Sequence, residues 1–345
     1  MSHKTAIDFL DVSMNKRKRI LGLRTIGGAG YITYDEELYI KWLSILQREI
    51  EVCRMLQIDG TINSDVVMLE SFNSATIEGA KTTIAEVKSA ITKNEKTKSE
   101  LMVLNLLKAN EIELGSKVTL DTLLDMWFTI VDGCCENTNA GTDGLRSGMV
   151  YVGSESKVVH VPEKPMYLEQ RMKELLLFVN STEDKLLASI VSHFYLEYIH
   201  PFCDGNGRLG RLFAMKVLNK DEAYISLPIA RVINESLGTY YRVFCESEKP
   251  CGYDVDITPF MEYMLNVYQK ALKQYQLLSK PLCNSESLIM QKITEQNRGT
   301  ISVAKAAKIL DCTEWEAVKV LNALVDKGYL VFRNNEYRLS WRTLN

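Results

Sequence analysis

The stretch HPFCDGNGRLGR, residues 200–211, determines how this chain is interpreted. Apolar residues recur at helical spacing before it, over 185–200, and after it, over 208–218. Pro201 disfavours helical geometry at the preceding residue, so the first helix is expected to end at His200. The sequence therefore predicts a tight turn between two helices, with an imidazole held at a helix end.

The glycines of this turn make it suited to phosphate. Gly205 and Gly207 flank Asn206 and allow consecutive backbone N–H groups to point inward, next to the N-terminus of the second helix. Arg208 and Arg211 lie three residues apart on that helix, so both guanidinium groups are expected on one side of its first turn. Two fixed cations beside an anion site suit a di- or triphosphate better than a single phosphate.

Two further side chains complete a reaction site. Asp204 offers the hard oxygen ligand that a phosphate-bound Mg²⁺ requires. His200 is suited to deprotonate an incoming hydroxyl near neutral pH. Cys203 is a conceivable nucleophile, but only the loop itself would lower the pKa of its thiol. The eight cysteines include no Cys-x-x-Cys pair, so free thiols in a reducing compartment are expected.

These residues resemble the Fic-domain motif His-x-Phe-x-(Asp/Glu)-Gly-Asn-Gly-Arg-x-x-Arg and match it at every defined position. The resemblance implies transfer of AMP from Mg-ATP to a Ser, Thr or Tyr hydroxyl of a protein, with release of pyrophosphate. It implies that His200 is the base, that Asp204 binds the metal and that Phe202 anchors the loop in the core. The residues expected to hold the phosphates are Gly205, Asn206, Gly207, Arg208 and Arg211.

A second motif lies upstream, where SATIEG spans residues 74–79. Ser74 and Glu78 are one turn apart on a short helix predicted over 71–79, which Gly79 can end. The motif resembles the family's inhibitory motif (Ser/Thr)-x-x-x-Glu-(Gly/Asn). A Glu78 carboxylate paired with Arg211 would occupy the guanidinium that the γ-phosphate needs, so the site is expected to be autoinhibited.

One β-hairpin is predicted among the helices. The β-branched runs 149–152 and 158–161 are joined by the turn 153–157. The resemblance implies a flap over 149–161 that aligns the target protein by strand addition, which suits an unpaired hairpin edge. The residues expected to align the target are Val158, Val159, His160 and Val161.

The adenosine pocket is indicated less directly. Related proteins place nucleotide-contacting residues at the distance where Asn234, Leu237, Tyr240 and Tyr241 follow the motif, and a tyrosine can stack on a purine. Packing in the core is the alternative role for the tyrosines. Arg146, just before the flap, is interpreted either as a substrate contact or as a brace for the hairpin.

The remaining patterns predict a mostly α-helical fold. Further helices are expected over 38–56, 83–91, 100–114, 120–132, 167–179 and 257–278. The predicted domains are an N-terminal helical region (1–63), a Fic-type helical bundle with one β-hairpin flap (64–278), a linker (279–284) and a small winged helix-turn-helix unit (285–345).

The C-terminal unit is predicted from three helices, over 285–296, 303–310 and 313–327, and a hairpin with strands at 329–332 and 337–339. Its third helix, the one expected to recognise DNA, is net negative, which disfavours attraction to phosphate. We therefore favour docking to a protein or to a second copy of the chain, and keep a DNA-binding regulator as an alternative. The charged residues concerned are Glu314, Glu316, Asp326, Lys319 and Lys327.

Composition excludes several classes of protein. The 345 residues are 46% hydrophobic and 25% charged, with a formal net charge of -3, so no global attraction to nucleic acid or membrane is visible. The basic run 16–19 is interpreted as a solvated segment. No apolar stretch approaches the roughly 20 residues that span a bilayer, and the polar start 1–4 lacks the apolar centre of a signal peptide. A cytoplasmic protein is expected.

Two enzymatic activities share these residues. The first is an autoinhibited AMP transferase that uses Mg²⁺ and ATP and acts on a target protein or on itself. The second is removal of AMP from a modified protein, with Glu78 orienting a water molecule. Loss of Glu78 should raise transfer and abolish removal, so this residue discriminates between them.

Overall fold

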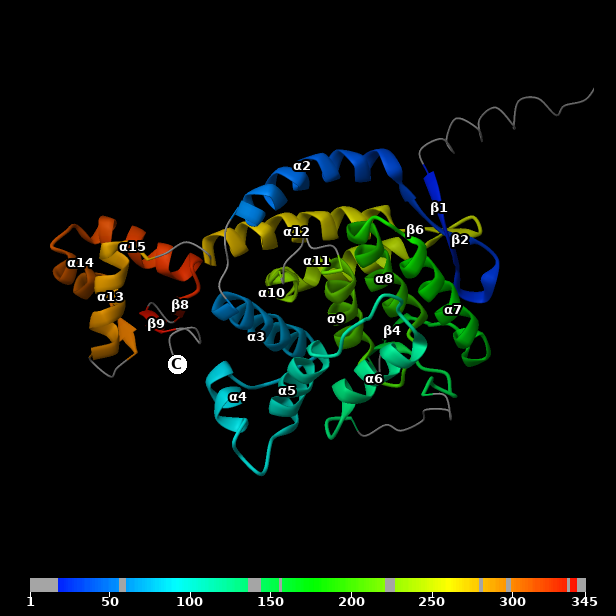
Figure 1. Ribbon diagram of the computed structural model, residues 1–345, viewed down its shortest axis with the longest axis horizontal. Coiled ribbons are helices and arrows are strands. Elements are labelled where there is room, and N and C mark those ends of the chain that lie inside the picture. The colour runs from blue at the N-terminus through cyan, green and yellow to red at the C-terminus, as the bar shows by residue number, and fades with distance from the viewer. Residues whose placement is uncertain are drawn as a thin grey trace, which may run out of the picture.

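Two buried helices, α8 (Lys185–Ile199) and α9 (Asn206–Leu218), lie at the centre of the structure and are joined by the glycine-rich turn. Nearly every residue of α8 is buried, as expected for a helix that is apolar on most of its surface. Ser189 fixes the pair, because its Oγ donates to the Ala214 carbonyl at 2.6 Å. Figure 1 shows the computed structural model, which describes residues 18–55, 60–135, 144–154, 157–220, 227–278, 282–295, 299–333 and 336–339.

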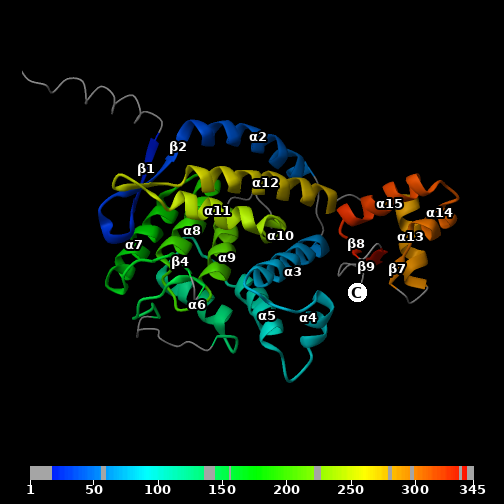
Figure 2. The same cartoon turned by 180° about the vertical axis from the view of Figure 1, so that it is seen from behind.

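Other helices surround this central pair (Figures 1 and 2). Most of the predicted helices are confirmed, with ends that shift by a few residues; α5 ends at Asn110 rather than at residue 114. The surrounding helices are α2 (Glu36–Met55), α3 (Gly60–Ile77), α4 (Ile84–Ala90), α5 (Lys98–Asn110), α6 (Leu120–Val131), α7 (Pro165–Ser181), α10 (Ile229–Glu235), α11 (Leu237–Ser247) and α12 (Thr258–Leu278).

The N-terminal region departs from its prediction. A helical region was expected over 1–63, but β1 (Lys18–Arg24) and β2 (Tyr31–Asp35) are strands. They join β5 (Pro250–Cys251) and β6 (Asp254–Asp256) in a sheet of order β1-β2-β6-β5, in which β2 and β6 are parallel. The expectation of one β-hairpin in the body is therefore wrong. Residues 1–17, which include part of the basic run, lie outside the described residues.

The helix that carries the upstream motif is longer than predicted. It was expected over 71–79, whereas α3 runs from Gly60 to Ile77 and so crosses the predicted domain boundary at 63/64. Glu78 follows the last helical residue, and Gly79 has a φ of +87°, which ends the helix. The α3 helix packs against α10, since Ala230 N donates to the Glu70 carboxylate at 2.7 Å.

The flap and the C-terminal unit have the expected elements. The flap strands are β3 (Val152–Ser154) and β4 (Lys157–His160), so the first strand begins later than predicted. The C-terminal unit has its own apolar core and lies at the end of α12 (Figures 1 and 2). It contains α13 (Asn284–Glu295), β7 (Thr300–Ile301), α14 (Val303–Leu310), α15 (Glu314–Asp326), β8 (Leu330–Arg333) and β9 (Glu336–Leu339), with β9 central in a three-stranded sheet.

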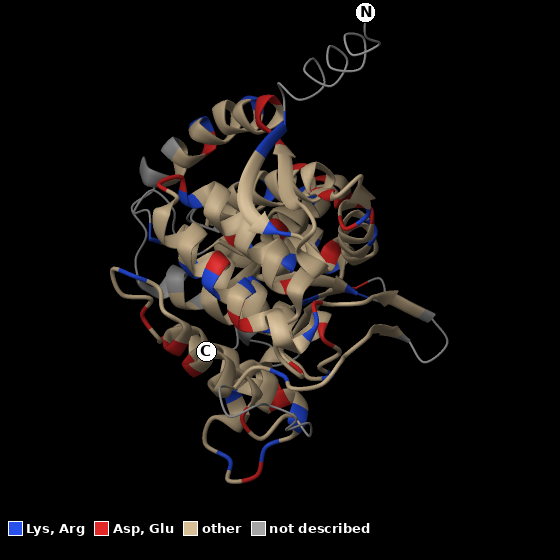
Figure 3. Ribbon diagram, turned by 90° about the vertical axis from the view of Figure 1, so that its right-hand side faces the viewer, with Lys and Arg blue, Asp and Glu red and all other residues tan. Residues whose placement is uncertain are grey.

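Two of the sequence predictions concern membrane-spanning helices and the distribution of charge. None of the described helices is long and apolar enough to cross a bilayer. On the side seen in Figure 3, basic and acidic residues are interspersed rather than gathered into a face of one sign. Part of the predicted linker, residues 279–281, lies outside the described residues.

Candidate active site

The glycine-rich turn is anchored in the core by aromatic packing. Phe202 is fully buried and stacks on Trp127, with ring centroids 4.7 Å apart. Trp127 Nε1 also donates to the Asp204 carbonyl at 2.8 Å. Gly205 has a φ of +81°, and a Cβ there would lie 2.9 Å from Val131, so only glycine fits. These contacts fix the path of the loop from α8 into α9.

Asn206 shapes the loop through its side chain. Its Oδ1 accepts from Phe202 N at 2.9 Å and its Nδ2 donates to the Phe202 carbonyl at 2.8 Å. Both polar ends of this amide are therefore engaged within the loop. The first backbone N–H groups of α9 have no partners inside the helix, as at any helix start, and they lie at the loop. The structure thus supplies an anion site from the backbone, with Asn206 holding its shape.

His200 lies at the end of α8 in the left-handed region, with a φ of +51°. Its Nδ1 lies 3.3 Å from the Glu197 carbonyl, which can only accept, so Nδ1 carries the proton. Burial lowers the pKa of His200 to about 4, with help from the charges of His160 and Arg146. At neutral pH the imidazole is therefore uncharged, with Nε2 free to accept a proton.

Arg146 holds the backbone of His200 in place. The guanidinium is buried and donates to the carbonyls of His200 at 2.7 Å and of Gly148 at 2.8 Å, as well as to that of Glu163. Of the two interpretations offered for this arginine, the brace for the hairpin matches the contacts.

Arg208 and Arg211 do not share neighbours, contrary to the expectation that both guanidinium groups would face one side. Arg208 points to the end of α6, where Nη1 lies 3.3 Å from Cys134 Sγ, and Nη2 lies 3.2 Å from Asp204 Oδ1. Arg211 points to α3 instead. Residues three apart on a helix share a stripe, but long side chains turn toward their own partners.

Asp204 is ionised and accessible. Burial alone would raise the pKa of its carboxyl, but hydrogen bonds from Cys135 and Gly205 and the charge of Arg208 lower it overall. Its side chain is 47% exposed, which leaves oxygen lone pairs open to the cavity. Burial raises the pKa of the Cys203 thiol, so this cysteine is a poor nucleophile.

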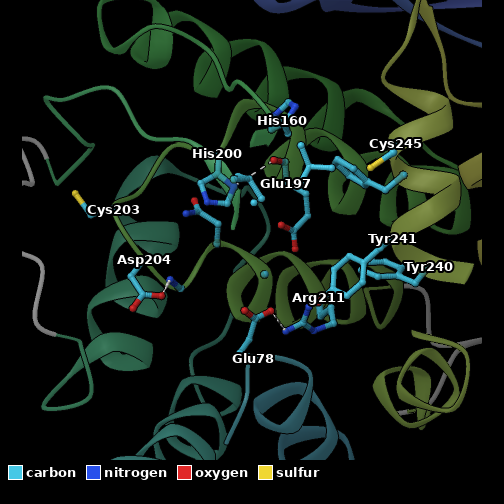
Figure 4. Close-up of a pocket in the computed structure, with 17 residues that line it drawn as sticks. Glu78, His160, Glu197, His200, Cys203, Asp204, Arg211, Tyr240, Tyr241 and Cys245 are labelled. Atoms are coloured by element: carbon cyan, nitrogen blue, oxygen red, sulfur yellow. Dashed lines mark hydrogen bonds and ion pairs between the residues drawn. The ribbon is translucent and has the colours of Figure 1, made fainter. Parts of the chain in front are cut away.

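Glu78 and Ser74 both hydrogen-bond to Arg211, and Figure 4 shows the contact made by Glu78. Arg211 Nη2 lies 2.7 Å from Glu78 Oε1, and Arg211 Nε donates to Ser74 Oγ at 2.9 Å. The Ser74 carbonyl accepts a third hydrogen bond, from Nη2 at 3.0 Å. The pairing deduced from the sequence is therefore present, and it also uses the hydroxyl and the carbonyl of Ser74.

A cavity of about 420 Å³ opens at this site (Figure 4). Figure 4 shows Glu78 beside Arg211, Tyr240 and Tyr241 of α11 next to Arg211, and His200 beside the loop. The lining residues are Glu78, Val152, Gly153, Val159, His160, Glu197, His200, Cys203, Asp204, Gly205, Asn206, Gly207, Arg211, Tyr240, Tyr241, Phe244 and Cys245.

The four residues expected at an adenosine pocket divide into two pairs. Tyr240 and Tyr241 line the cavity, whereas Asn234 and Leu237 do not. Asn234 Nδ2 donates to Asn73 Oδ1 at 3.0 Å, and Leu237 packs against the core. Asn234 lies away from the cavity because it precedes the break between α10 and α11 and faces α3.

The flap residues also divide. Val159 and His160 line the cavity, while Val158 and Val161 do not, although all three valines are about half exposed. His160 is buried, and its Nε2 lies 2.7 Å from the Tyr198 carbonyl while its Nδ1 lies 2.5 Å from Glu248 Oε2. His160 thus attaches the flap to the body.

Several cavity residues were not anticipated from the sequence, namely Glu197, Phe244 and Cys245. Glu197 had a usable signal, since it is a charged residue in an otherwise apolar helix one turn before His200. Phe244 and Cys245 had none, because their helix is amphipathic and its cavity face depends on packing with α12.

The helices α8 and α9 and the glycine-rich loop between them belong to a known class of helical domain. Residues 118–218 match the sequence model of the Fic/DOC family, so this segment is a Fic/DOC domain.

Similar proteins agree with this assignment. The chain is 25% identical over 245 residues to the protein adenylyltransferase Fic of Drosophila grimshawi, covering 67% of this chain and 47% of that protein. It is 26% identical over 176 residues to the protein of the same name from Nematostella vectensis, covering 50% of this chain and 37% of that one. The matches thus span less than half the length of these two relatives.

A solved structure shares the fold. A Fic family protein from Desulfovibrio desulfuricans superimposes with a TM-score of 0.60 at 22% identity, covering 87% of this chain and 96% of that one. A Fic domain protein from Bacteroides thetaiotaomicron gives a TM-score of 0.56 at 18% identity, covering 68% of this chain and 97% of that one. The mostly helical Fic-type fold is therefore established.

Proposed function

We propose that this chain transfers AMP from ATP to a hydroxyl group of a protein and that Glu78 inhibits the reaction. The observation that carries the proposal is the neutral His200, whose Nε2 is free beside a loop of backbone donors. The names of the sequence relatives support the same chemistry, since both are called protein adenylyltransferases.

The reaction proceeds as an in-line displacement at the α-phosphorus. The acceptor hydroxyl gives its proton to His200 Nε2, and its oxygen forms a bond to the α-phosphorus while the bond to the β-phosphate oxygen breaks. Pyrophosphate leaves with the electron pair of that bond. The N–H groups at the start of α9 stabilise the charge that develops on the phosphoryl oxygens.

Mg²⁺ fits the proposed site through one carboxylate. The ionised, half-exposed Asp204 can provide one oxygen, and Mg²⁺ bound with ATP takes its other ligands from phosphates and water. The ion would offset phosphate charge during the displacement. The described residues contain no cluster of three acidic, histidine or cysteine ligands, so an all-protein site is not the expected mode.

Glu78 inhibits by occupying Arg211. The γ-phosphate needs a cation at the outer end of the phosphate site, and Arg211 already donates to Glu78 and Ser74. The Glu78 carboxylate also adds a negative charge next to Gly207, which repels a triphosphate. ATP bound against this charge would be held in an unproductive pose.

The test uses ATP labelled at the α-phosphate, with Mg²⁺, purified protein and cell extract. The variants are Glu78→Gly, Glu78→Gly/His200→Ala and the control Glu95→Gly, which removes an exposed acidic side chain from a loop. Release of Arg211 should raise protein labelling by about five- to 150-fold in Glu78→Gly. Glu95→Gly should match wild type, and the double variant should stay unlabelled. An unlabelled Glu78→Gly protein would contradict the proposal.

Removal of AMP is the second candidate, and one observation favours it. The Glu78 carboxylate lies in the cavity beside the loop, where it could orient a water molecule toward a bound phosphoryl group. The two activities are separated with an AMP-modified protein as substrate. Glu78→Gly would lose removal while gaining transfer.

A DNA-binding role for the C-terminal unit finds little support in its charges. Lys327 lies 2.5 Å from Glu286 Oε2, and Lys319 Nζ lies 3.3 Å from the centroid of the Trp315 ring. Lys327, directly after α15, is therefore paired within the unit, while Lys319 lies on an exposed ring at the surface. We keep docking to a protein, or to a second copy of the chain, as the proposed role, and a cytoplasmic location as part of the same proposal.

A further inference from the structure

The Glu197 carboxylate faces the cavity but takes no part in the transfer described above. It lies on α8, one turn before His200, and lines the cavity together with the loop and α11. Figure 4 shows its side chain between His200 and Tyr241, with the carboxylate directed into the cavity toward Arg211. A charged group in this position is in reach of any ligand that fills the cavity.

This carboxylate has no hydrogen bond or ion pair within the described part of the chain. Burial raises the pKa of Glu197 to about 7; the charge of Arg211 opposes this rise and that of Glu78 adds to it. A Cβ at Gly210 would lie 3.4 Å from Glu197 Oε1, so the glycine leaves just enough room for the carboxylate. A partly buried acceptor without a donor costs free energy, and a ligand that supplies a donor would recover it.

The position of Glu197 indicates which part of a nucleotide would supply the donor. The phosphates of a nucleotide belong at the backbone donors of the loop and at Arg211, and an aromatic base belongs against Tyr240 and Tyr241 on α11. A sugar between the loop and the tyrosines would lie where Glu197 projects (Figure 4). Above its pKa of about 7, the Glu197 carboxylate only accepts hydrogen bonds. Ionised phosphate oxygens have no hydrogen to donate to it, whereas ribose hydroxyls do.

We propose that Glu197 accepts a hydrogen bond from the 2′- or 3′-hydroxyl of the bound nucleotide and so selects ribonucleotides over deoxyribonucleotides. The inference rests on the proposed function in that it requires the phosphates of ATP to bind at the loop. Acidic side chains bind ribose hydroxyls in the same way in dinucleotide-binding folds. The adenine amino group is a second donor within ATP, and the test below distinguishes it.

The experiment measures binding rather than activity. The full chain carries Glu78→Gly to free Arg211 and His200→Ala to prevent turnover. In this background, position 197 is Glu, Gln or Ala. Isothermal titration in the presence of Mg²⁺ gives the Kd of ATP, 2′-deoxy-ATP, 3′-deoxy-ATP and a purine riboside triphosphate that lacks the 6-amino group.

With Glu197 present, one or both deoxynucleotides should bind about ten-fold or more weakly than ATP, as expected for loss of a hydrogen bond to a charged group. The analogue without the amino group should keep the affinity of ATP. Glu197→Ala should remove the difference between ATP and the deoxynucleotides, and Glu197→Gln should retain part of it, since its carbonyl still accepts.

Three results would overturn the inference. The first is equal affinity for ATP and both deoxynucleotides with Glu197 present. The second is a preference for ATP over the deoxynucleotides that persists in Glu197→Ala. The third is a loss of affinity seen only for the analogue without the 6-amino group, which would assign the contact to adenine. Failure of ATP itself to bind in the Glu197 background would instead contradict the proposed function, and the inference with it. The isosteric Glu197→Gln variant separates loss of the contact from loss of folding.

Discussion

The carboxylate of Glu78 lies so close to Gly207 that a Cβ at position 207 would overlap with Glu78 Oε1. The same oxygen accepts from Arg211 Nη2 at 2.7 Å. The acidic side chain directly after α3 therefore lies against the glycine-rich loop itself, as well as against Arg211. A glycine at 207 provides this space, so the loop and the end of α3 fit each other closely.

Ser74→Ala should relieve inhibition in part. The variant removes the acceptor of Arg211 Nε but leaves Glu78 in place. Because one hydrogen bond contributes about 0.5–1.5 kcal/mol, AMP transfer should rise by about two- to ten-fold, less than in Glu78→Gly. The measurement is labelling with α-phosphate-labelled ATP. Thr76→Ala is the matched control, since its hydroxyl bonds only to the Phe72 carbonyl on the same helix. Equal labelling of the two variants would rule out a role for Ser74.

His200 should remain uncharged well below neutral pH. Its pKa is lowered to about 4, so the folded protein takes up this proton only in strong acid, while the unfolded chain takes it up near the ordinary histidine value of about 6.5. Between these values the unfolded chain binds more protons, and this residue makes stability rise with pH. NMR titration of the imidazole signals, assigned with His200→Ala, should show no transition between pH 5.5 and 8. A midpoint near 6.5 would contradict the expected burial.

Glu70 should make the protein less stable as pH rises. Burial raises the pKa of this carboxyl to about 8, although hydrogen bonds from Ala230 and Arg231 N–H oppose the rise. Between the ordinary glutamate pKa and 8, the folded state holds a proton that the unfolded chain releases. Stability therefore falls by up to about 1.4 kcal/mol per pH unit across this window.

The check for this effect is the Glu70→Gln variant, whose amide is neutral at every pH. Denaturant unfolding at pH 5, 6, 7 and 8 gives the free energy of unfolding of both proteins. The free energy of unfolding of the variant should increase relative to that of wild type as the pH rises. A difference that stays constant across the series would show that Glu70 is ionised in the folded protein.

Phe202→Ala should destabilise the chain and the loop together. The ring is fully buried and stacks on Trp127, so its removal leaves a cavity that costs about 3–5 kcal/mol. Phe128→Ala is the control, because Phe128 also neighbours Trp127 but is 54% exposed. Thermal unfolding should show a large loss only for Phe202→Ala. Comparable losses in both variants would mean that Phe202 does not anchor the loop.

The loop could be predicted from the sequence for a local reason, whereas the pairing of Glu78 with Arg211 was predicted from the resemblance of residues 74–79 to an inhibitory motif. Pro201 and the two glycines restrict the backbone over a few residues, and the helices on both sides have clear periodicity. The divergence of Arg208 from Arg211 could not be predicted, because spacing along a helix places Cα atoms and does not say which distant group each side chain meets. Arg208 meets Cys134, which lies far away in the sequence.

The N-terminal sheet was missed because its stability is not local. Residue Ile32 pairs with Val255, so β2 has one of its two partner strands more than two hundred residues away. Short strands such as β5 and β6 carry little periodic signal of their own and are recognised only once their neighbours are in place. In the same way, which residues of α10 and α11 line the cavity depends on packing, so the sequence could not show that Tyr240 and Tyr241 line it and Asn234 does not.

Because Glu78 and Arg211 belong to one chain, their contact is unimolecular. Neither dilution nor a low expression level weakens it, in contrast to inhibition by a separate protein, and each molecule is expected to leave folding with the arginine already occupied. An activator is therefore expected to act on the segment that holds Glu78 in place. This segment is the α3 helix, which hydrogen bonds of Glu70 and Asn73 attach to α10. Under the proposed function, the regulatory switch is thus expected at the junction of α3 and α10, outside the cavity.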